Sequence, residues 1–320
     1  MINTSNWGYL VAPGLRKVMV DSYKQYEPYY PKLLNVFSSS RAYEDDVDGT
    51  GVGKLTETAQ SASTTFQDPL QGYKTRYTPA EYRAGIQMSR QANEDDLYRQ
   101  LGKSASMLGS AAARTYDDIA MGTLFRQSFN TANTSYGDAL PLCSTVHTRI
   151  DGGSTQSNAS ATSIALGESG LNTGLLAVRQ VLDGKGQLVN FMDAKPLLMV
   201  APYQEKLALE LVGSNLRSAT ADNDTNYYKH FAQFDVFINP WMSALSTGST
   251  QGAGTDLYWF IIMQNRHSLN LFKRIPFSVD EDRDIDTQTL KMIAFLRFAY
   301  GWSDWRGLWG SKGDASSYSN

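Results

Sequence analysis

The longest regular pattern of hydrophobic and polar positions lies between Asn93 and Phe129. Its apolar or small residues follow one another at steps of four, four and three, so Leu97, Leu108 and Ile119 stand eleven residues apart. This spacing is close to the natural turn of an α-helix and predicts one long, straight helix of roughly 50 Å. The complete stripe comprises Leu97, Leu101, Ala105, Leu108, Ala112, Tyr116, Ile119 and Thr123.

Both ends of this predicted helix carry suitable residues. Asn93 is a good N-cap, and the acidic residues 94–96 follow it at the positive end of the helix dipole. Arg126 lies in the last turn, where a cation is favoured. Small residues at 105, 109 and 113 predict a face where a sheet can approach closely.

Strand patterns precede the helix. Residues 73–77 and 82–88 alternate apolar with charged or polar side chains, as strands with one apolar face do. Together with residues 52–66 they predict a long two-stranded excursion that closes near Asp68-Pro69 and Gln71-Gly72. A lone hairpin is marginally stable in water, so this excursion should rest against another surface, such as another subunit.

Residues 1–38 show little regular periodicity but contain many aromatic side chains. Pro28 and Pro31 are expected to hold this stretch extended. Two interpretations stay open, an arm that lies on something else and a tyrosine-rich loop packed on its own domain.

A mixed α+β pattern follows the long helix. After an irregular stretch at 130–162, a helix is predicted over Leu166–Leu182, with Leu182 on its apolar face and Gly184 as its stop. A buried strand over Pro196–Ala201 and a short helix over Gln204–Val212 come next. Further strands are predicted at Gln233–Ile238, Leu257–Met263, Leu269–Ile275 and Thr289–Tyr300.

Three tryptophans, Trp302, Trp305 and Trp309, follow the last strand among glycines. Indole rings in such a tail could stack on bases or sugars. We favour the interpretation that they anchor the last strand in the core.

Composition narrows the function classes. The chain has 29 basic and 32 acidic residues, a formal charge of −3, which is unlike the basic surface of a protein that grips nucleic acid. Its single cysteine excludes a disulfide within the chain and suits a reducing compartment. Pro13 interrupts the apolar run near the start, so no signal peptide is expected. No stretch approaches the roughly 20 apolar residues that a membrane span needs. A soluble protein made in the cytoplasm is therefore expected.

Two loop motifs fail as nucleotide or ion sites. Gly49–Lys54 has glycines like a phosphate-binding loop, but Asp48 and Leu55 stand where glycine and a hydroxyl residue are needed. Glu44, Asp46 and Asp48 alternate as calcium ligands do, but Leu55 replaces the required bidentate glutamate. A solvated acidic turn is expected instead.

Cys143 and His147 are four residues apart and could be metal ligands or a nucleophile with its base. Two ligands do not close a zinc site and no orienting third group is evident, so a buried thiol and a hydrogen-bonded histidine are expected. The acidic run Asp280–Asp286 is expected to be a solvated loop, and no spacing selects a carboxylate pair for hydrolysis. The sequence predicts no catalytic residue, cofactor or metal, and thus a structural or binding role.

Several segments support a family resemblance. Leu142–His147 (LCSTVH) looks like the Leu-Phe-Ser-Thr-Ala-His segment after the spine helix of Mu-type head subunits, with Cys143 for Phe and Val146 for Ala. Pro196–Pro202, followed by Glu205 and Ala208, is similar to a strand and helix of that branch.

Tyr258-Trp259 ahead of Asn265-Arg266, and the segment Arg297–Trp302, also fit. In these segments and in the order of its parts, the chain resembles the major capsid proteins of tailed bacteriophages, which have the Hong Kong phage-type fold.

The resemblance implies an α+β phage major capsid fold with five parts. These are an N-terminal arm at 1–38, an extended loop with a long β-hairpin at 39–91, a peripheral domain with the spine helix at 92–160, an axial α+β domain at 161–285, and a return strand with the C-terminus at 286–320.

The same resemblance implies a non-enzymatic virion protein, made in the host bacterial cytoplasm, that forms hexamers and pentamers of an icosahedral shell. Other copies of the chain, a scaffold, a portal, and decoration or cement proteins are the expected partners. The shell would enclose double-stranded DNA without sequence-specific binding and without a membrane. Tyr73, Tyr77 and Arg283 are the predicted contacts between subunits.

Two alternatives stay open. An encapsulin-like compartment shares the fold but encloses protein cargo. A carbohydrate-binding or hydrolytic virion component is the other, suggested by the Gly/Ser/Thr-rich segments and the three C-terminal tryptophans.

Overall fold

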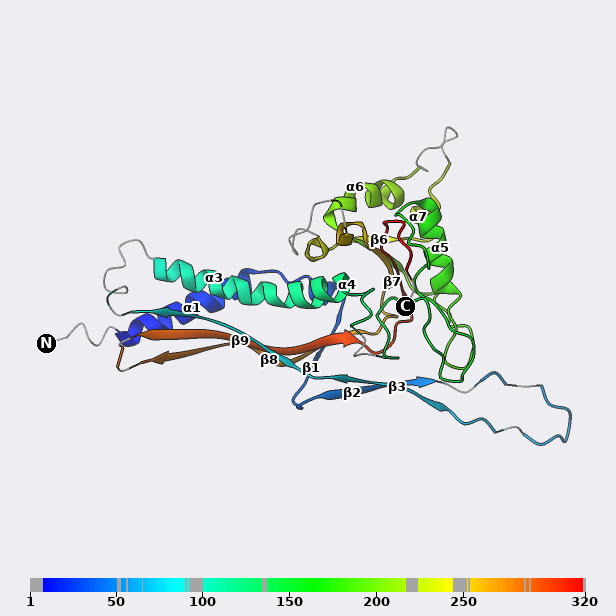
Figure 1. Ribbon diagram of the computed structural model, residues 1–320, viewed down its shortest axis with the longest axis horizontal. Helices are drawn as coiled ribbons and strands as arrows, with labels where there is room; N and C mark the ends of the chain where they lie inside the picture. Colours follow the sequence, from blue (N-terminus) through cyan, green and yellow to red (C-terminus); the bar gives the residue numbers. More distant parts are fainter. Residues whose placement is uncertain are drawn as a thin grey trace. The chain divides into compact units, whose positions relative to one another are not determined.

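The computed structural model describes residues 8–50, 53–55, 57–64, 66–89, 91, 100–133, 137–216, 224–243, 252, 254–284, 286–287 and 289–318. Side chains are described for the same residues except 8–13, 49–50, 100–101 and 283. The chain forms two units (Figure 1). The first comprises residues 1–44, 77–121 and 271–300, and the second comprises residues 45–76, 122–270 and 301–320.

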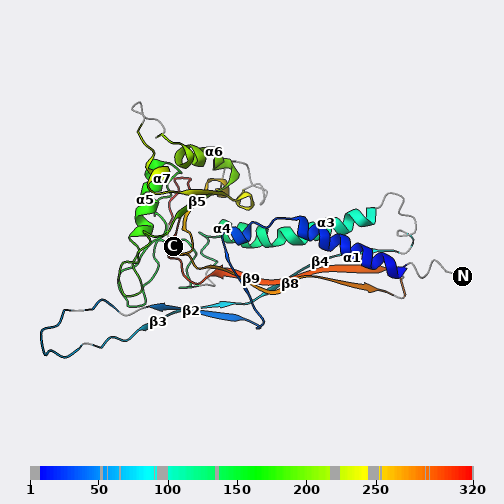
Figure 2. The ribbon, with the colours of Figure 1, turned by 180° about the vertical axis from the view of Figure 1, so that it is seen from behind.

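A four-stranded sheet is the framework of the first unit. Its order is β1-β8-β9-β4, and β4 pairs antiparallel with β9. The helices α1 (Gly8–Gln25) and α3 (Gln100–Tyr116) lie along the same side of this sheet in both ribbon views (Figures 1 and 2). The strands are β1 (Asn35–Ser38), β8 (Leu269–Arg283), β9 (Leu290–Trp302) and β4 (Ala80–Met88).

The predicted long helix is confirmed over the described residues 100–126. The helix α3 continues through a π-helical stretch (Asp117–Thr123) into α4 (Leu124–Arg126), while the predicted cap at Asn93 lies outside the described residues. The apolar stripe is as predicted from Ala105 to Tyr116, whereas Leu97 and the side chain of Leu101 lie outside the described part. Beyond Tyr116, Ala120 and Leu124 are buried instead of Ile119 and Thr123. The wider turns of a π-helix explain this shift by one residue.

The N-terminal stretch differs from its prediction, because Gly8–Gln25 is helical and not extended. Its described buried positions are Leu15, Met19 and Ser22, a helical spacing of four and three residues. The polar Ser22 obscured this short stripe in the sequence, and its Oγ lies 2.7 Å from that of Ser106 on α3. The following segment turns through a 3₁₀-helix at Tyr30–Lys32, with Pro31 near its start.

The small-residue face of α3 also has a different neighbour from the one predicted. A Cβ atom at Gly109 would collide with the backbone carbonyl of Met19, so the close approach at this position is by α1 and not by a sheet.

The excursion comprises residues 44–77, with β2 (Glu44–Thr50) and β3 (Leu70–Tyr77) forming a two-stranded sheet. The predicted closure near residues 68–72 is wrong, because the described turn is at Ala59–Ala62, where the Ala62 N–H donates to the Ala59 carbonyl at 3.0 Å. Residues 80–88 form β4 of the other sheet and not part of the excursion, since Thr78-Pro79 separates β4 from β3.

A second four-stranded sheet, in the order β10-β7-β5-β6, forms the framework of the second unit. β5 pairs parallel with β6 and antiparallel with β7, which pairs antiparallel with β10. These strands confirm the predicted mixed α+β pattern. Their bounds are β5 (Pro196–Val200), β6 (Asp235–Ile238), β7 (Trp259–Met263) and β10 (Leu308–Ser311).

Several helical segments accompany this sheet. The helix α5 (Glu168–Arg179) ends before Leu182, which forms an isolated bridge with Leu188 and so leaves the predicted helix. The remaining helical segments are α6 (Glu205–Ala208), a π-helical turn (Leu209–Gly213), α7 (Tyr227–His230), and 3₁₀-helices at Pro202–Gln204, Pro240–Met242 and Gly254–Leu257.

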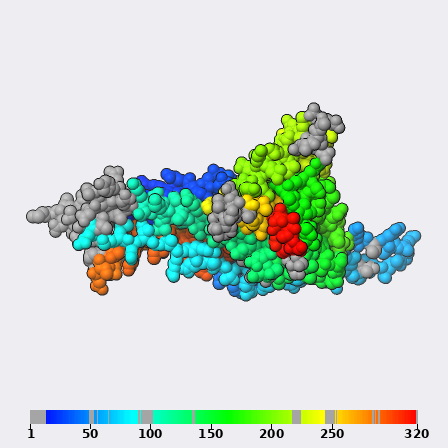
Figure 3. Space-filling model, turned by 45° about the horizontal axis from the view of Figure 1, so that its top comes forward, coloured from blue at the N-terminus to red at the C-terminus, as the bar shows by residue number. Residues whose placement is uncertain are grey.

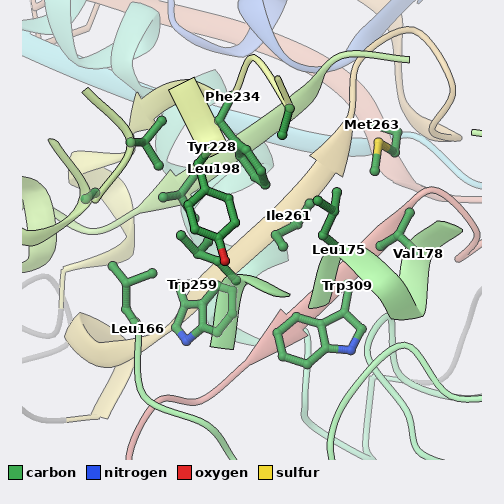
Figure 4. Packing of buried hydrophobic residues seen from close by; sticks show 14 of the residues in the cluster. Leu166, Leu175, Val178, Leu198, Tyr228, Phe234, Trp259, Ile261, Met263 and Trp309 are labelled. Carbon is green, nitrogen blue, oxygen red and sulfur yellow. The ribbon is translucent and has the colours of Figure 1, made fainter. Parts of the chain in front are cut away.

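The core of the second unit lies between α5 and the sheet (Figure 4). Leu171, Leu175 and Val178 of α5 are buried, and the rings of Trp259 and Trp309 are tilted against each other with centroids 5.0 Å apart. Burying each such side chain stabilises the fold by about 1.5–3 kcal/mol. Trp302 and Trp305 are buried as well, so the three C-terminal tryptophans are anchors, as we favoured.

Candidate functional site

Two hydrogen bonds fix the root of the excursion to the rest of the second unit. On β3, the Tyr73 and Thr148 hydroxyls lie 2.7 Å apart, and Thr75 Oγ1 accepts a 2.8 Å bond from the Gly137 N–H. Thr75 is almost fully buried. Residues 73–75 are therefore held on one face of β3 by two segments that follow the long helix.

The third support of the root is Arg306. Its Nη1 lies 3.4 Å from Asp48 Oδ2 on β2 and 3.0 Å from Asp304 Oδ1, and its Nε donates to the Leu182 carbonyl at 2.9 Å. Burial raises the pKa of the Asp48 carboxyl, and the nearby Asp304 charge raises it further, while the Arg306 charge opposes both. The three side chains thus form a coupled charge cluster under the excursion.

The outer part of the excursion has little support from its own chain. Even at the base of the excursion, the ion pairs of Asp45 with Arg76 and Lys74, each 2.7 Å long, are exposed, and these two cations lower the pKa of Asp45. Exposed pairs of this kind stabilise a fold very little. In the space-filling view, no other described part of the chain packs around the light-blue tip on the visible face (Figure 3).

Two large apolar side chains stand in this exposed region. Leu55 is 97% exposed and Phe66 is 92% exposed. Next to them the two sides of the excursion are joined by polar groups, since the Gly53 N–H donates to Gln67 Oε1 at 2.7 Å and Gln67 Nε2 donates to the Lys54 carbonyl at 3.2 Å. These two exposed apolar side chains make the tip of the excursion a candidate contact surface.

A second set of exposed apolar side chains lies on α6, α7 and the segments joined to them. Tyr227 and Phe231 stack with ring centroids 6.0 Å apart, and Phe231 is 72% exposed. These elements form a further candidate contact surface of the second unit. The exposed set is Tyr203, Leu207, Leu209, Leu216, Tyr227 and Phe231.

The three predicted contact residues lie in different environments. Tyr73 belongs to the root of the excursion, and Tyr77 is fully buried with its ring 4.8 Å from that of Phe272. Arg283 ends β8, and its side chain lies outside the described part of the chain. Their contact with a neighbouring subunit stays a prediction, although the burial of Tyr77 assigns that side chain to the interior of the chain.

Cys143 and His147 are both buried but have separate partners. Burial raises the pKa of the Cys143 thiol, and its hydrogen bond to Ser128 opposes this. His147 Nδ1 lies 2.6 Å from Asp138 Oδ2, and its Nε2 lies 3.0 Å from Asn158 Oδ1. A thiol that stays protonated is a poor nucleophile, so this arrangement is that of two buried structural groups.

The remaining motifs are also not assembled into sites. Glu44, Asp46 and Asp48 lie on β2, and Gly49–Lys54 includes the end of that strand and residues outside the described part. Among the described residues, no three His, Cys, Asp or Glu side chains are close enough together to hold a metal ion. Within the same residues, no helix has the length and apolar character of a membrane span.

Comparison with known proteins adds independent findings. A family model for phage capsid proteins matches residues 72–311. No curated protein matches the sequence of the chain.

Solved structures match over nearly the whole chain. The mature capsid of bacteriophage PhiM1 is 11% identical with a TM-score of 0.57, and the match covers 90% of this chain and 87% of that one. The capsid of cyanophage P-SCSP1u is 13% identical with a TM-score of 0.54, covering 89% and 87%. A virus-like particle from Pyrococcus furiosus is 8% identical with a TM-score of 0.51, covering 93% and 98%. At such identities the likeness concerns the fold alone, and the predicted fold class is confirmed.

Proposed function

The chain belongs to the phage capsid protein family, and on that premise we propose that it is the major capsid protein of a tailed bacteriophage. In this role it assembles into the hexamers and pentamers of an icosahedral shell that encloses double-stranded DNA. The protein is structural, not enzymatic. It is made in the host bacterial cytoplasm and works with a scaffold, a portal and decoration or cement proteins.

The excursion is the observation that carries this proposal. Its loop exposes Leu55 and Phe66 almost completely, and its described polar contacts near the tip are exposed too. A second copy of the chain would bury these side chains and add stability through association. The formal charge of −3 supports the proposal that the shell encloses DNA, because a shell that bound DNA tightly would hinder its packing and release.

The encapsulin-like compartment remains the second candidate, because the Pyrococcus furiosus virus-like particle has the same fold. The contents of purified particles distinguish the two. We expect DNA that resists nuclease until the particles are opened. Protein cargo without such DNA would favour the compartment.

The carbohydrate-binding or hydrolytic alternative loses its main support. Trp302, Trp305 and Trp309 are at most 5% exposed, so their rings cannot stack on a glycan.

A double substitution in the excursion tests the proposed assembly. Leu55→Ser with Phe66→Ser should leave the unfolding transition of the subunit unchanged, because neither side chain is buried in the chain. Light scattering should detect fewer or no large assemblies. Met192→Ser, at a 65% exposed apolar residue outside the excursion, is the matched control. Normal assembly by the double variant would contradict a role for the tip.

A further inference from the structure

A turn that follows α5 reaches the excursion beyond its root. Lys185 Nζ donates to the Asp68 carbonyl at 2.6 Å, although the two residues stand 117 positions apart in the chain. Both ribbon views show green loops of the second unit beside the blue excursion (Figures 1 and 2). This contact is additional to the three supports of the root, which hold Asp48, Tyr73 and Thr75.

Asp68 lies where the loop of the excursion leaves its paired strands. β2 ends at Thr50 and β3 begins at Leu70, and no strand is described between them. Among the described residues from 53 to 69, Asp68 makes the only hydrogen bond to a residue outside the excursion. Pro69 favours an extended backbone at Asp68, which gives the accepting carbonyl a defined direction. One bond therefore decides whether the loop is held against the second unit or is joined to it only through the root.

The turn that carries Lys185 has a fixed backbone. Asp183 Oδ1 accepts from the Lys185 N–H at 2.9 Å and from the Gln187 N–H at 2.7 Å. The Asp183 carbonyl accepts from the Gly186 N–H at 3.1 Å. Gly186 has a φ of 74°, and a Cβ atom at this position would meet the Arg149 guanidinium at 2.5 Å, so only glycine fits.

The base of the turn is also held by side chains. Leu182 and Leu188 form an isolated bridge. Gln156 Oε1 accepts from the Leu182 N–H at 2.8 Å, and Gln156 Nε2 donates to the Leu182 carbonyl at 3.1 Å. The same carbonyl accepts from Arg306, which also supports the root. Residues 182–188 are therefore a rigid bracket that presents one flexible lysine side chain to the excursion.

We propose that Lys185 is a positioning residue that holds the excursion in one direction before another copy of the chain meets it. With the bond to Asp68 closed, the loop is fixed at two places; with the bond open, it pivots about the root. A typical hydrogen bond shifts such an equilibrium about fivefold. Holding the loop in advance lowers the ordering cost of association. The role in association rests on the proposed function, whereas the bond is a property of one chain.

Three substitutions isolate the bond. Lys185→Met keeps the aliphatic stem and removes the donor, while Lys185→Arg supplies a donor again. Lys229→Met is the matched control, because Lys229 Nζ also makes an exposed bond to a backbone carbonyl, that of Gly213, at 2.5 Å. All three variants should keep the unfolding transition of the natural chain, since both bonds are exposed.

Double electron–electron resonance between two spin labels measures the direction of the loop. One label is attached at Ser63→Cys in the exposed loop and the other at Asn172→Cys on α5, whereas burial protects Cys143 from labelling. Dilution with unlabelled chains removes distances between copies. We expect one narrow distance distribution in the natural chain, Lys185→Arg and Lys229→Met, and loss of that narrow peak in Lys185→Met. A broad distribution in the natural chain, or a narrow one in Lys185→Met, would overturn the proposal.

The onset of assembly is the second readout. The protein concentration at which light scattering first detects assemblies should rise about fivefold in Lys185→Met and return to the natural value in Lys185→Arg. A broadened loop with an unchanged onset would overturn the positioning role. If the natural chain formed no assemblies, the proposed function would fail, and the distance distributions would still decide whether Lys185 holds the loop.

Discussion

Tyr73 and Tyr77 lie on the same strand but differ in what their side chains do. Tyr77→Ala removes a fully buried ring from beside Phe272, so we expect it to lower the free energy of unfolding by about 3–5 kcal/mol. Tyr73→Phe removes only the hydroxyl that meets Thr148 and should lower it by about 0.5–1.5 kcal/mol.

Denaturant unfolding of the two variants measures both effects. Equal losses would contradict the assignment of Tyr77 to the interior. Since Tyr77 acts on folding, a combined Tyr73 and Tyr77 variant cannot separate assembly from folding. Substitutions at the exposed Leu55 and Phe66 can separate these two effects.

At the scale of elements, the packing of α1 on α3 is testable with two glycines of one helix. Gly109→Ala would place a Cβ atom against the Met19 carbonyl, and backbone cannot yield as a flexible side chain can. We expect this variant to be less stable than the natural chain, although alanine favours a helix by about 1 kcal/mol.

Gly102→Ala is the matched control, because nothing lies within 4 Å of the added Cβ atom. It should raise the melting temperature of the chain through helix propensity alone. If Gly109→Ala raised the melting temperature equally, the close approach of α1 at this position would be contradicted.

The same elements show what the sequence could and could not predict. Repeated apolar spacing was sufficient to predict the described part of the long helix, α5 and the buried strands of the second unit. Apolar spacing did not predict α1, because the buried stripe of this helix includes the polar Ser22, which packs against α3. A π-helical stretch shifts the stripe after Tyr116 without any periodic signal.

The candidate site was less accessible to sequence reasoning than the fold. Alternation at residues 73–77 and 82–88 suggested one excursion, but strand pairing assigns the two segments to different sheets. Side-chain bonds join His147 to residues nine and eleven positions away, and no local sequence pattern encodes such bonds. His147 was singled out with Cys143, whereas its bonded partners are Asp138 and Asn158.

At the scale of the whole molecule, each of the two units has its own sheet, and the excursion leaves large apolar side chains in water. Such a chain gains stability when other copies cover those side chains, so stability and assembly are linked. Membership of the phage capsid protein family and the shared capsid fold agree with this physical picture.

Electron microscopy of the purified full-length protein, alone or co-expressed with a scaffold, tests the central claim most directly. The proposed function predicts closed shells with icosahedral symmetry, built from six-fold and five-fold clusters of the chain. A uniform population of monomers at high concentration, without shells or ring-shaped clusters, would contradict it.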